Sequence, residues 1–181
     1  MKQALYITII ISLLISCRAP KEVLMPFRNY YVGSGRLMPL QQSDAKDCVR
    51  IWVCRSTSLD RVISIEKEID SSFNGNLTTF GHIWNKSKKA TGRFKTQKLE
   101  PASGYASFFR KLDELNISTY ESQSESELTL HQPYLFCTVE TLKSGDYHSF
   151  SFQLDSEVKV ERYETLIQLF QVQFPPVKFN R

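Results

Sequence analysis

The stretch YLFCTVETLKSGDYHSFSFQLD, residues 134–155, contains two alternating segments on either side of a turn signal at Ser144-Gly145. If the turn is centred on these two residues, Cys137 faces Phe152 and Val139 faces Phe150. One face then collects Leu135, Cys137, Val139, Phe150, Phe152 and Leu154, and the other carries Thr138, Glu140, Ser149, Ser151 and Gln153. A single register places the apolar residues of both segments on one face and the polar residues on the other. The stretch therefore predicts a β-hairpin packed on a core.

Upstream, the same alternation predicts three more strands. Val49, Ile51 and Val53 alternate around Trp52, and turn-forming residues follow at 56–60. A second strand begins at Val62, with Ile63, Ile65 and Ile69 expected on one face. The triplet 74–76, Asn-Gly-Asn, is typical of a turn, so residues 77–84 are expected to form the third strand. The first half of the chain is therefore predicted to be an antiparallel meander.

Two segments show helical periodicity instead. Between Pro101 and Leu115, an apolar stripe with spacings of three and four residues comprises Tyr105, Phe108, Phe109, Leu112 and Leu115. Ser156 is expected to cap a second helix, which ends before Pro175 and whose stripe comprises Tyr163, Leu166, Ile167 and Phe170. The element order is β-β-β-α-β-β-α. It predicts an α+β domain with an antiparallel sheet of about five strands and both helices on one face.

The first seventeen residues have the order of a secretory signal. Lys2 precedes an apolar run from Ala4 to Ile15, and Ser16 and Cys17 follow. The run spans only about 18 Å as a helix, less than the ~30 Å hydrocarbon core of a bilayer. An uncleaved membrane helix and a signal peptide without lipid are the weaker alternatives.

The tetrapeptide Leu14-Ile15-Ser16-Cys17 resembles the lipobox of bacterial lipoproteins. The resemblance implies that residues 1–16 are removed and that the Cys17 thiol carries a diacylglycerol. It also implies a bacterial cell-envelope protein held on a membrane by its acyl chains, with the leaflet left open. In its layout the chain is similar to the small single-domain lipoproteins of Bacteroidota. In element order alone it is also similar to emfourin-type inhibitors of thermolysin-like proteases.

Residues 17–47 are expected to tether the domain to the membrane. Pro20, Pro26, Pro39, Gly33 and Gly35 interrupt a stretch without clear periodicity. Aromatic residues within it could pack on the domain, which we expect to span residues 48–181. With 41% hydrophobic residues, 12 Phe and 8 Tyr, the chain can fill one core. Its net charge of +4 is too small to indicate a polyanion, so nucleic acid is not an expected partner.

Three cysteines remain once Cys17 is lipidated. Cys48 and Cys54 flank an extended stretch, so their Cα atoms should lie roughly 20 Å apart, too far for a mutual disulfide. Two alternatives stay open: a bridge from Cys137 to Cys48 or Cys54, or three buried thiols without a bridge.

Motifs for catalysis, cofactor binding and metal binding are missing from the sequence. His82, His131 and His148 have no ligand partner in a metal-binding spacing. A Cys137–His148 dyad fails because the hairpin register places His148 opposite Thr141, roughly 13 Å from Cys137. There is no G-x-S-x-G, S-x-x-K, P-loop or G-x-G-x-x-G. We therefore predict no catalytic, cofactor or metal residue.

A basic segment remains as a candidate binding surface. Residues 86–99 contain no acidic residue, and their cations are Lys86, Lys88, Lys89, Arg93, Lys95 and Lys98. They could attract an acidic protein or an anionic component of the envelope, or they could belong to a solvated loop. Taken together, these features predict a lipid-anchored envelope protein with a non-catalytic binding, inhibitory or accessory domain. The alternative is an envelope hydrolase with an unrecognised active site.

Overall fold

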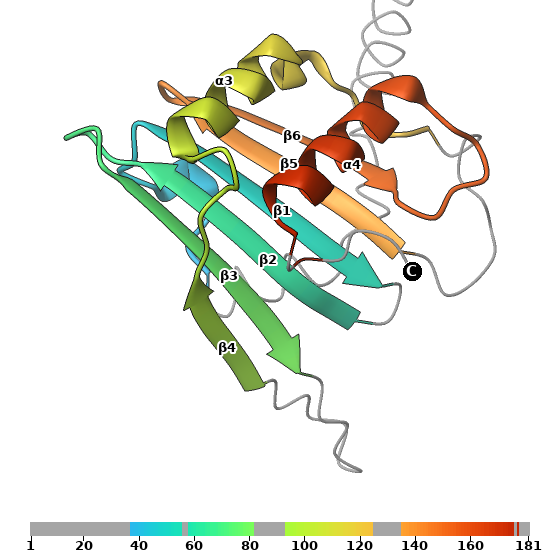
Figure 1. The fold of residues 1–181 in the computed structure, drawn as a ribbon, viewed down its shortest axis with the longest axis horizontal. Coiled ribbons are helices and arrows are strands. Elements are labelled where there is room, and N and C mark those ends of the chain that lie inside the picture. Colours follow the sequence, from blue (N-terminus) through green and yellow to red (C-terminus); the bar gives the residue numbers. More distant parts are fainter. Residues whose placement is uncertain (1–36, 56–57, 82–92, 125–134, 176, 178–181) are drawn as a thin grey trace, which may run out of the picture.

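The computed structural model describes residues 37–55, 58–81, 93–124, 135–175 and 177 as one α+β unit (Figure 1). Its strands are β1 (Asp47–Arg55), β2 (Ser58–Lys67), β3 (Phe73–Gly81), β4 (Arg93–Lys98), β5 (Leu135–Lys143) and β6 (Asp146–Gln153). Its helices are α3 (Tyr105–Glu114) and α4 (Glu161–Gln173), with short 3₁₀ turns η1 (Leu40–Gln42) and η2 (Ile117–Thr119).

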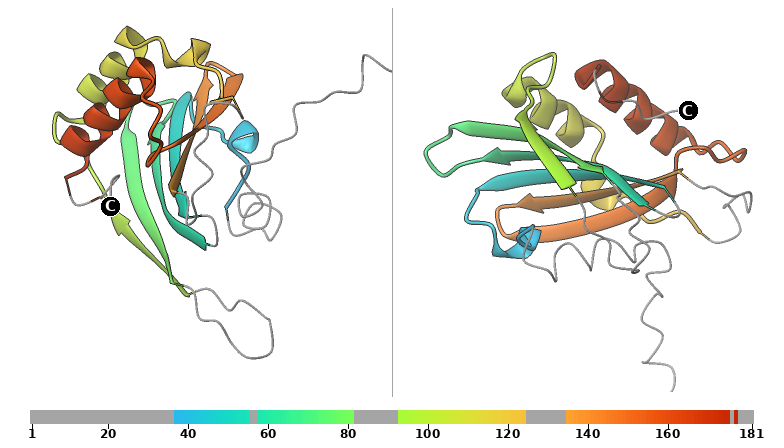
Figure 2. Two further views of the ribbon diagram at one scale, coloured as in Figure 1. Left: turned by 90° about the vertical axis from the view of Figure 1, so that its right-hand side faces the viewer. Right: turned by 90° about the horizontal axis from the view of Figure 1, so that it is seen from below.

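The six strands form one antiparallel sheet in the order β4-β3-β2-β1-β5-β6. The first strand of the chain lies between β2 and β5, so the meander and the hairpin share a single sheet. Figures 1 and 2 show both helices on the same face of this sheet. The predicted α+β class and the two-layer arrangement are confirmed, with six strands where about five were expected.

The predicted hairpin has the predicted register. Cys137 pairs with Phe152, Val139 with Phe150, and Thr141 with His148. Ser144 and Gly145 form the turn with φ angles of 51° and 91°, the left-handed backbone that a two-residue hairpin turn requires. Burial of the apolar face therefore selects the pairing, since a slip by one residue would turn every core side chain to the opposite face.

The main core lies between the sheet and the two helices. Both predicted helical stripes face it, with Phe108 and Leu112 buried on α3 and Tyr163, Leu166, Ile167 and Phe170 buried on α4. The ring centroids of Phe108 and Phe174 lie 5.2 Å apart, which joins α3 to the end of α4. At the same place, the side-chain carbonyl of Gln173 accepts hydrogen bonds from the backbone N–H and the hydroxyl of Ser103.

Several element boundaries differ from the prediction. β2 begins at Ser58 and not at Val62, and α3 begins at Tyr105 and not at Pro101.

The Asn-Gly-Asn triplet lies inside β3, and the turn before it is made by residues 68–72, with Ser71 at φ 69°. A Cβ on Gly75 would stand 2.1 Å from the carbonyl oxygen of Leu99, so this glycine permits a close approach of the backbone rather than a turn. Ile69, expected on the strand face, is exposed in that turn.

The second helix begins four residues later than predicted. Ser156 accepts a hydrogen bond from the backbone N–H of Val158, and Val160 is the residue before the first turn of α4. The serine therefore forms a local turn instead of a helix cap.

The fourth strand was not predicted. Arg93–Lys98 pairs with β3 although the segment is basic and polar, without an apolar face of its own. In the part of the chain that the structure describes, the candidate basic segment is a strand and not a solvated loop.

The domain extends N-terminal to Cys48. Leu40 is fully buried against Cys48 and Leu142, on the sheet face opposite the helices. The guanidinium of Arg50 donates a hydrogen bond of 2.9 Å to the carbonyl of Met38. The backbone N–H of Lys46 donates to the backbone carbonyl of Lys67. Residues 37–47 of the expected tether therefore belong to the folded domain, and residues 17–36 lie outside the described part.

Candidate functional site

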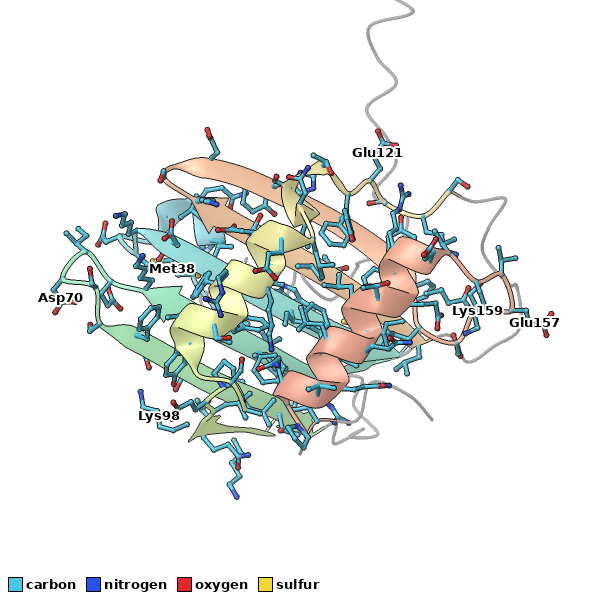
Figure 3. The ribbon with its side chains drawn as sticks, turned by 45° about the horizontal axis from the view of Figure 1, so that its top comes forward. Met38, Asp70, Lys98, Glu121, Glu157 and Lys159 are labelled. Carbon is cyan, nitrogen blue, oxygen red and sulfur yellow. The ribbon has the colours of Figure 1, made fainter. Side chains whose placement is uncertain are left out.

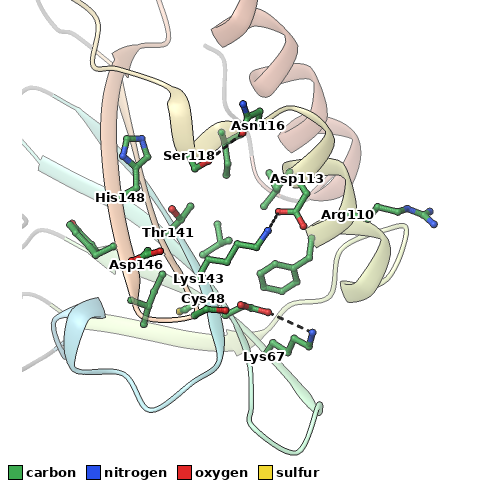
Figure 4. A pocket seen from close by; sticks show the side chains of 18 of the residues that line it. Cys48, Lys67, Arg110, Asp113, Asn116, Ser118, Thr141, Lys143, Asp146 and His148 are labelled. Carbon is green, nitrogen blue, oxygen red and sulfur yellow. Dashed lines mark hydrogen bonds and ion pairs between the residues drawn. The ribbon is translucent and has the colours of Figure 1, made fainter.

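A cleft of about 810 Å³ lies between α3 and the strand ends at one side of the sheet (Figure 4). One wall is the outer part of α3 together with residues 116–118, and the other comes from the ends of β1, β2, β5 and β6. Strand alternation explains which side chains enter it. Asp47, Lys67 and Lys143 are register partners, and they lie on the same sheet face as the core residues.

The cleft continues the core beyond the point where the helices cover the sheet. Phe109, Leu112 and Ile117 supply apolar surface on the helix side, and Phe73 supplies it from the start of β3. Towards the opening, the sheet residues change from Val49 to charged side chains. The cleft therefore combines an apolar interior with a polar mouth, a combination typical of small-ligand sites.

Two lysine–aspartate pairs mark the mouth. Lys143 Nζ lies 2.7 Å from Asp113 Oδ1 and so joins β5 to α3, and both side chains are more than half exposed. Lys67 Nζ lies 3.6 Å from Asp47 Oδ2 across the β1–β2 pair. Arg110 and Asp146 also line the cleft, so its cations and carboxylates are balanced.

His148 lies at the β6 side of the same cleft. Its Nε2 is 2.7 Å from the carbonyl oxygen of Tyr120, and its ring centroid is 5.8 Å from that of Phe150. Because a carbonyl oxygen can only accept, Nε2 is the donor in this contact. Thr141 is the register partner of His148, as predicted, so Cys137 lies further along the strand and the two do not form a dyad.

Cys48, Cys54 and Cys137 are all buried, and no disulfide joins any two of them. Cys137 faces the helix-covered core, whereas Cys48 and Cys54 alternate with core residues of β1 and face the other side of the sheet. Of the two alternatives left open by the sequence, the structure has the unbridged thiols and not the bridge from Cys137. Burial raises the pKa of Cys137 and of Cys48 well above the usual value for a thiol, with the nearby Cys54 and Glu66 adding to the respective shifts. Neither thiol is therefore activated as a nucleophile.

A second polar cluster lies on the helix-free face. The buried carboxylate of Glu140 accepts hydrogen bonds from Trp52 Nε1 at 2.5 Å and from the Tyr147 hydroxyl at 2.7 Å. Arg50 Nη1 lies 4.0 Å from the same carboxylate, and its guanidinium stands over the Trp52 ring. This Glu140 cluster ties β1 to the hairpin. Its burial assigns it a role in the fold instead of a binding surface.

The basic segment is only partly within the described residues. Lys95 and Lys98 are exposed on β4, and Arg93 begins that strand, whereas Lys86, Lys88 and Lys89 lie outside the described part. Figure 3 places Lys98 at the edge of the sheet, where its Nζ donates to the Asn74 side chain at 2.5 Å. Lys95 and Lys98 do not belong to the lining of the cleft.

Sequence reasoning did not find the cleft. Its pairs join residues 30 and 20 positions apart, and the pattern of each element gives no sign of the other partner. The one available signal was the end of the apolar alternation in β5, where Lys143 follows the core residues on the same face.

No cluster of three or more metal-ligand side chains occurs among the residues that the structure describes. Within the same residues, no helix has the length and apolar character needed to cross a membrane. No protein-family model, curated protein or solved structure matches this chain.

Proposed function

We propose that this chain is a lipid-anchored protein of the bacterial cell envelope whose domain binds a small polar ligand in the α3 cleft without transforming it. The observation that carries the binding function is the cleft itself, with an apolar interior and a charge-balanced mouth. The anchor rests on the lipobox-like sequence ending at Cys17.

The residues of the cleft favour binding over catalysis. Asp47 and Asp113 each contact a lysine, and the imidazole of His148 contacts a backbone carbonyl. A nucleophile with an adjacent base, which covalent catalysis requires, is not formed by these lining residues. Balanced charge suits a ligand that carries both an amino and a carboxyl group, as a short peptide does.

The anchor is tested by replacing the proposed acylated residue. Cys17→Ser should accumulate as an unprocessed precursor and should lose incorporation of labelled palmitate, which the wild type retains. If mass spectrometry of the wild-type protein finds cleavage elsewhere and no lipid, the proposed lipid anchor at Cys17 is wrong.

The cleft is tested with two matched charge reversals. Lys143 and Lys159 are equally exposed and each pairs with a carboxylate, but only Lys143 lines the cleft. A panel of di- to tetrapeptides and short oligosaccharides is screened by the melting temperature of the wild-type protein. A compound that binds in the cleft should stabilise the wild type and Lys159→Glu but not Lys143→Glu.

The same compounds separate binding from hydrolysis. After prolonged incubation with the protein, a ligand of a binding domain should be recovered intact by mass spectrometry. Recovery as cleavage products that depend on Lys143 would support the alternative, an envelope hydrolase. Equal stabilisation of both lysine variants would place binding outside the cleft.

A further inference from the structure

The two edge strands of the sheet, β6 and β4, differ in the hydrogen bonding of their outer sides. At the β6 edge, the backbone N–H of Gln123 donates to the carbonyl of Ser151 at 2.8 Å, and the Ser122 hydroxyl accepts from the N–H of Ser151. Gln123 also accepts from the N–H of Gln153. At the other edge, β4 pairs with β3 on its inner side, and the outer side faces away from the sheet in Figures 1 and 2.

The direction of the β4 backbone groups follows from the register. The N–H of Leu99 donates to the carbonyl of Gly75, so alternate residues Gln97, Lys95 and Arg93 point their backbone groups at β3. Phe94, Thr96 and Lys98 then point their N–H and C=O groups outwards. The Thr78 and Thr96 hydroxyls lie 3.1 Å apart, as expected for the closer, non-hydrogen-bonded pairs of the ladder.

The side chains of this edge are accessible and carry positive charge. Residues Lys95 to Lys98 are all exposed, and both lysines belong to the acid-free segment 86–99. Among the described residues, no strand pairs with the outer side of β4. Such an edge can accept an additional strand from another polypeptide. We propose that the outer edge of β4 binds an extended acidic segment of a partner protein, which adds to the sheet beside β4.

Both the lysine side chains and the outward backbone groups of β4 favour an acidic strand over the alternatives. A second copy of the chain pairing through its own β4 would bring lysines opposite lysines, and like charges on paired strands are destabilising. An anionic lipid surface would satisfy the lysines, but it has no backbone to pair with the outward N–H and C=O groups. An acidic strand satisfies both, independently of any ligand in the cleft.

Proline at position 96 tests the backbone pairing. Thr96→Pro removes an outward N–H and leaves the ladder with β3 intact, because proline is tolerated on an edge strand with that N–H side facing out. The matched control is Thr96→Val, which also loses the hydroxyl contact but keeps the N–H. Both variants should unfold at a temperature close to that of the wild type.

Binding is measured by fluorescence polarisation of the full chain with a labelled octapeptide that alternates glutamate with valine. The wild type and Thr96→Val should bind it saturably, and Thr96→Pro should weaken binding at least about tenfold. Lys95→Glu should weaken binding by a similar factor, and a peptide with lysine for each glutamate should not bind.

Two results would overturn the proposal. One is equal binding of the acidic peptide by Thr96→Pro and Thr96→Val. The other is absence of peptide binding together with Lys95-dependent binding to vesicles of phosphatidylglycerol, which would assign the lysines to a lipid surface.

Discussion

At the scale of single residues, Cys137 shows how burial determines the chemistry of a side chain. It lies opposite Phe152 in the hairpin and Val53 in β1, and it is fully buried. Since its pKa is raised by desolvation, the reactive thiolate is suppressed at neutral pH. Thiol reagents should therefore label the folded protein at Cys137 far more slowly than the urea-unfolded protein.

The stability of a Cys137→Ala variant checks the same assignment. Loss of the buried sulfur should lower the free energy of unfolding by roughly 1–2 kcal/mol, through lost packing alone. Denaturant unfolding measures the change. Rapid labelling of folded Cys137 with an unchanged unfolding curve for the alanine variant would restore a catalytic role.

Glu140 supports a larger prediction, because its carboxylate is the shared acceptor of a buried cluster. Replacing it by leucine leaves the Trp52 and Tyr147 donors without this acceptor and leaves the Arg50 guanidinium beside an apolar group. Removal of one partner of a buried ion pair costs about 3–5 kcal/mol. Glu140→Gln keeps an acceptor oxygen and should lose less.

An exposed ion pair supplies the control for this comparison. Glu114 lies 3.8 Å from Arg110 on α3, and both side chains are about two-thirds exposed. Glu114→Leu should change the free energy of unfolding by less than about 1 kcal/mol. Equal losses for Glu140→Leu and Glu114→Leu would show that the Glu140 cluster does not stabilise the fold.

At the scale of elements, the sequence predicts those segments whose own side chains carry a period. The hairpin, β1, β2 and both helical stripes belong to this group, and the hairpin register could be derived because two segments constrain each other. β4 carries no such period, since the pairing of its backbone with β3 creates the strand. The Asn-Gly-Asn triplet was wrongly predicted to form a turn for a related reason. Position 75 needs a glycine because the carbonyl of Leu99, which is 24 residues away, leaves no room for a Cβ.

The 3₁₀ turn η1 gives a prediction that the sequence pattern does not suggest. Leu40 is fully buried in the small cluster with Cys48 and Leu142, although it lies in the Pro- and Gly-rich stretch. Leu40→Ala should lower the free energy of unfolding by about 2–5 kcal/mol. Met38→Ala, at a side chain that is half exposed, should change it by less than about 0.5 kcal/mol.

Truncation from the N-terminus locates the same boundary. A chain that begins at Leu37 should unfold like the mature protein, and one that begins at Ser43 should be destabilised by about as much as Leu40→Ala. If the chain from Ser43 unfolds like the longer one, residues 38–42 do not belong to the folded domain.

At the scale of the whole molecule, the predicted class and layers are right because binary patterning fixes which faces meet. The cleft could not be predicted, since it forms where α3 ends over strands that are distant in the sequence. Its mouth joins Asp113 on the helix to Lys143 on β5, and its far side is closed by His148 on β6. The positions of such side chains depend on strand order, which the pattern leaves open.

The thiols and phenols that are shielded from water make the whole domain less stable at alkaline pH. Burial raises the pKa of Cys48 and Cys137 above the usual 9.0, and it raises the pKa of Tyr105 and Tyr120 above the usual 10.0. Above about pH 9 the unfolded chain loses these protons first. Because it then binds fewer protons than the folded chain, the free energy of unfolding falls as pH rises.

Urea unfolding between pH 7 and pH 11 measures this dependence. The stabilising contribution of these groups should be fully present below pH 9. It should decrease steadily as the pH rises from there towards the pKa values of these groups in the folded protein. Cys137→Ala and Tyr120→Phe each remove one titrating group, so each should flatten the decrease, whereas Lys159→Ala should leave its slope unchanged. A free energy of unfolding that stays constant from pH 8 to pH 10.5 would contradict the assignment, because it would require these side chains to lose their protons as readily in the folded core as in water.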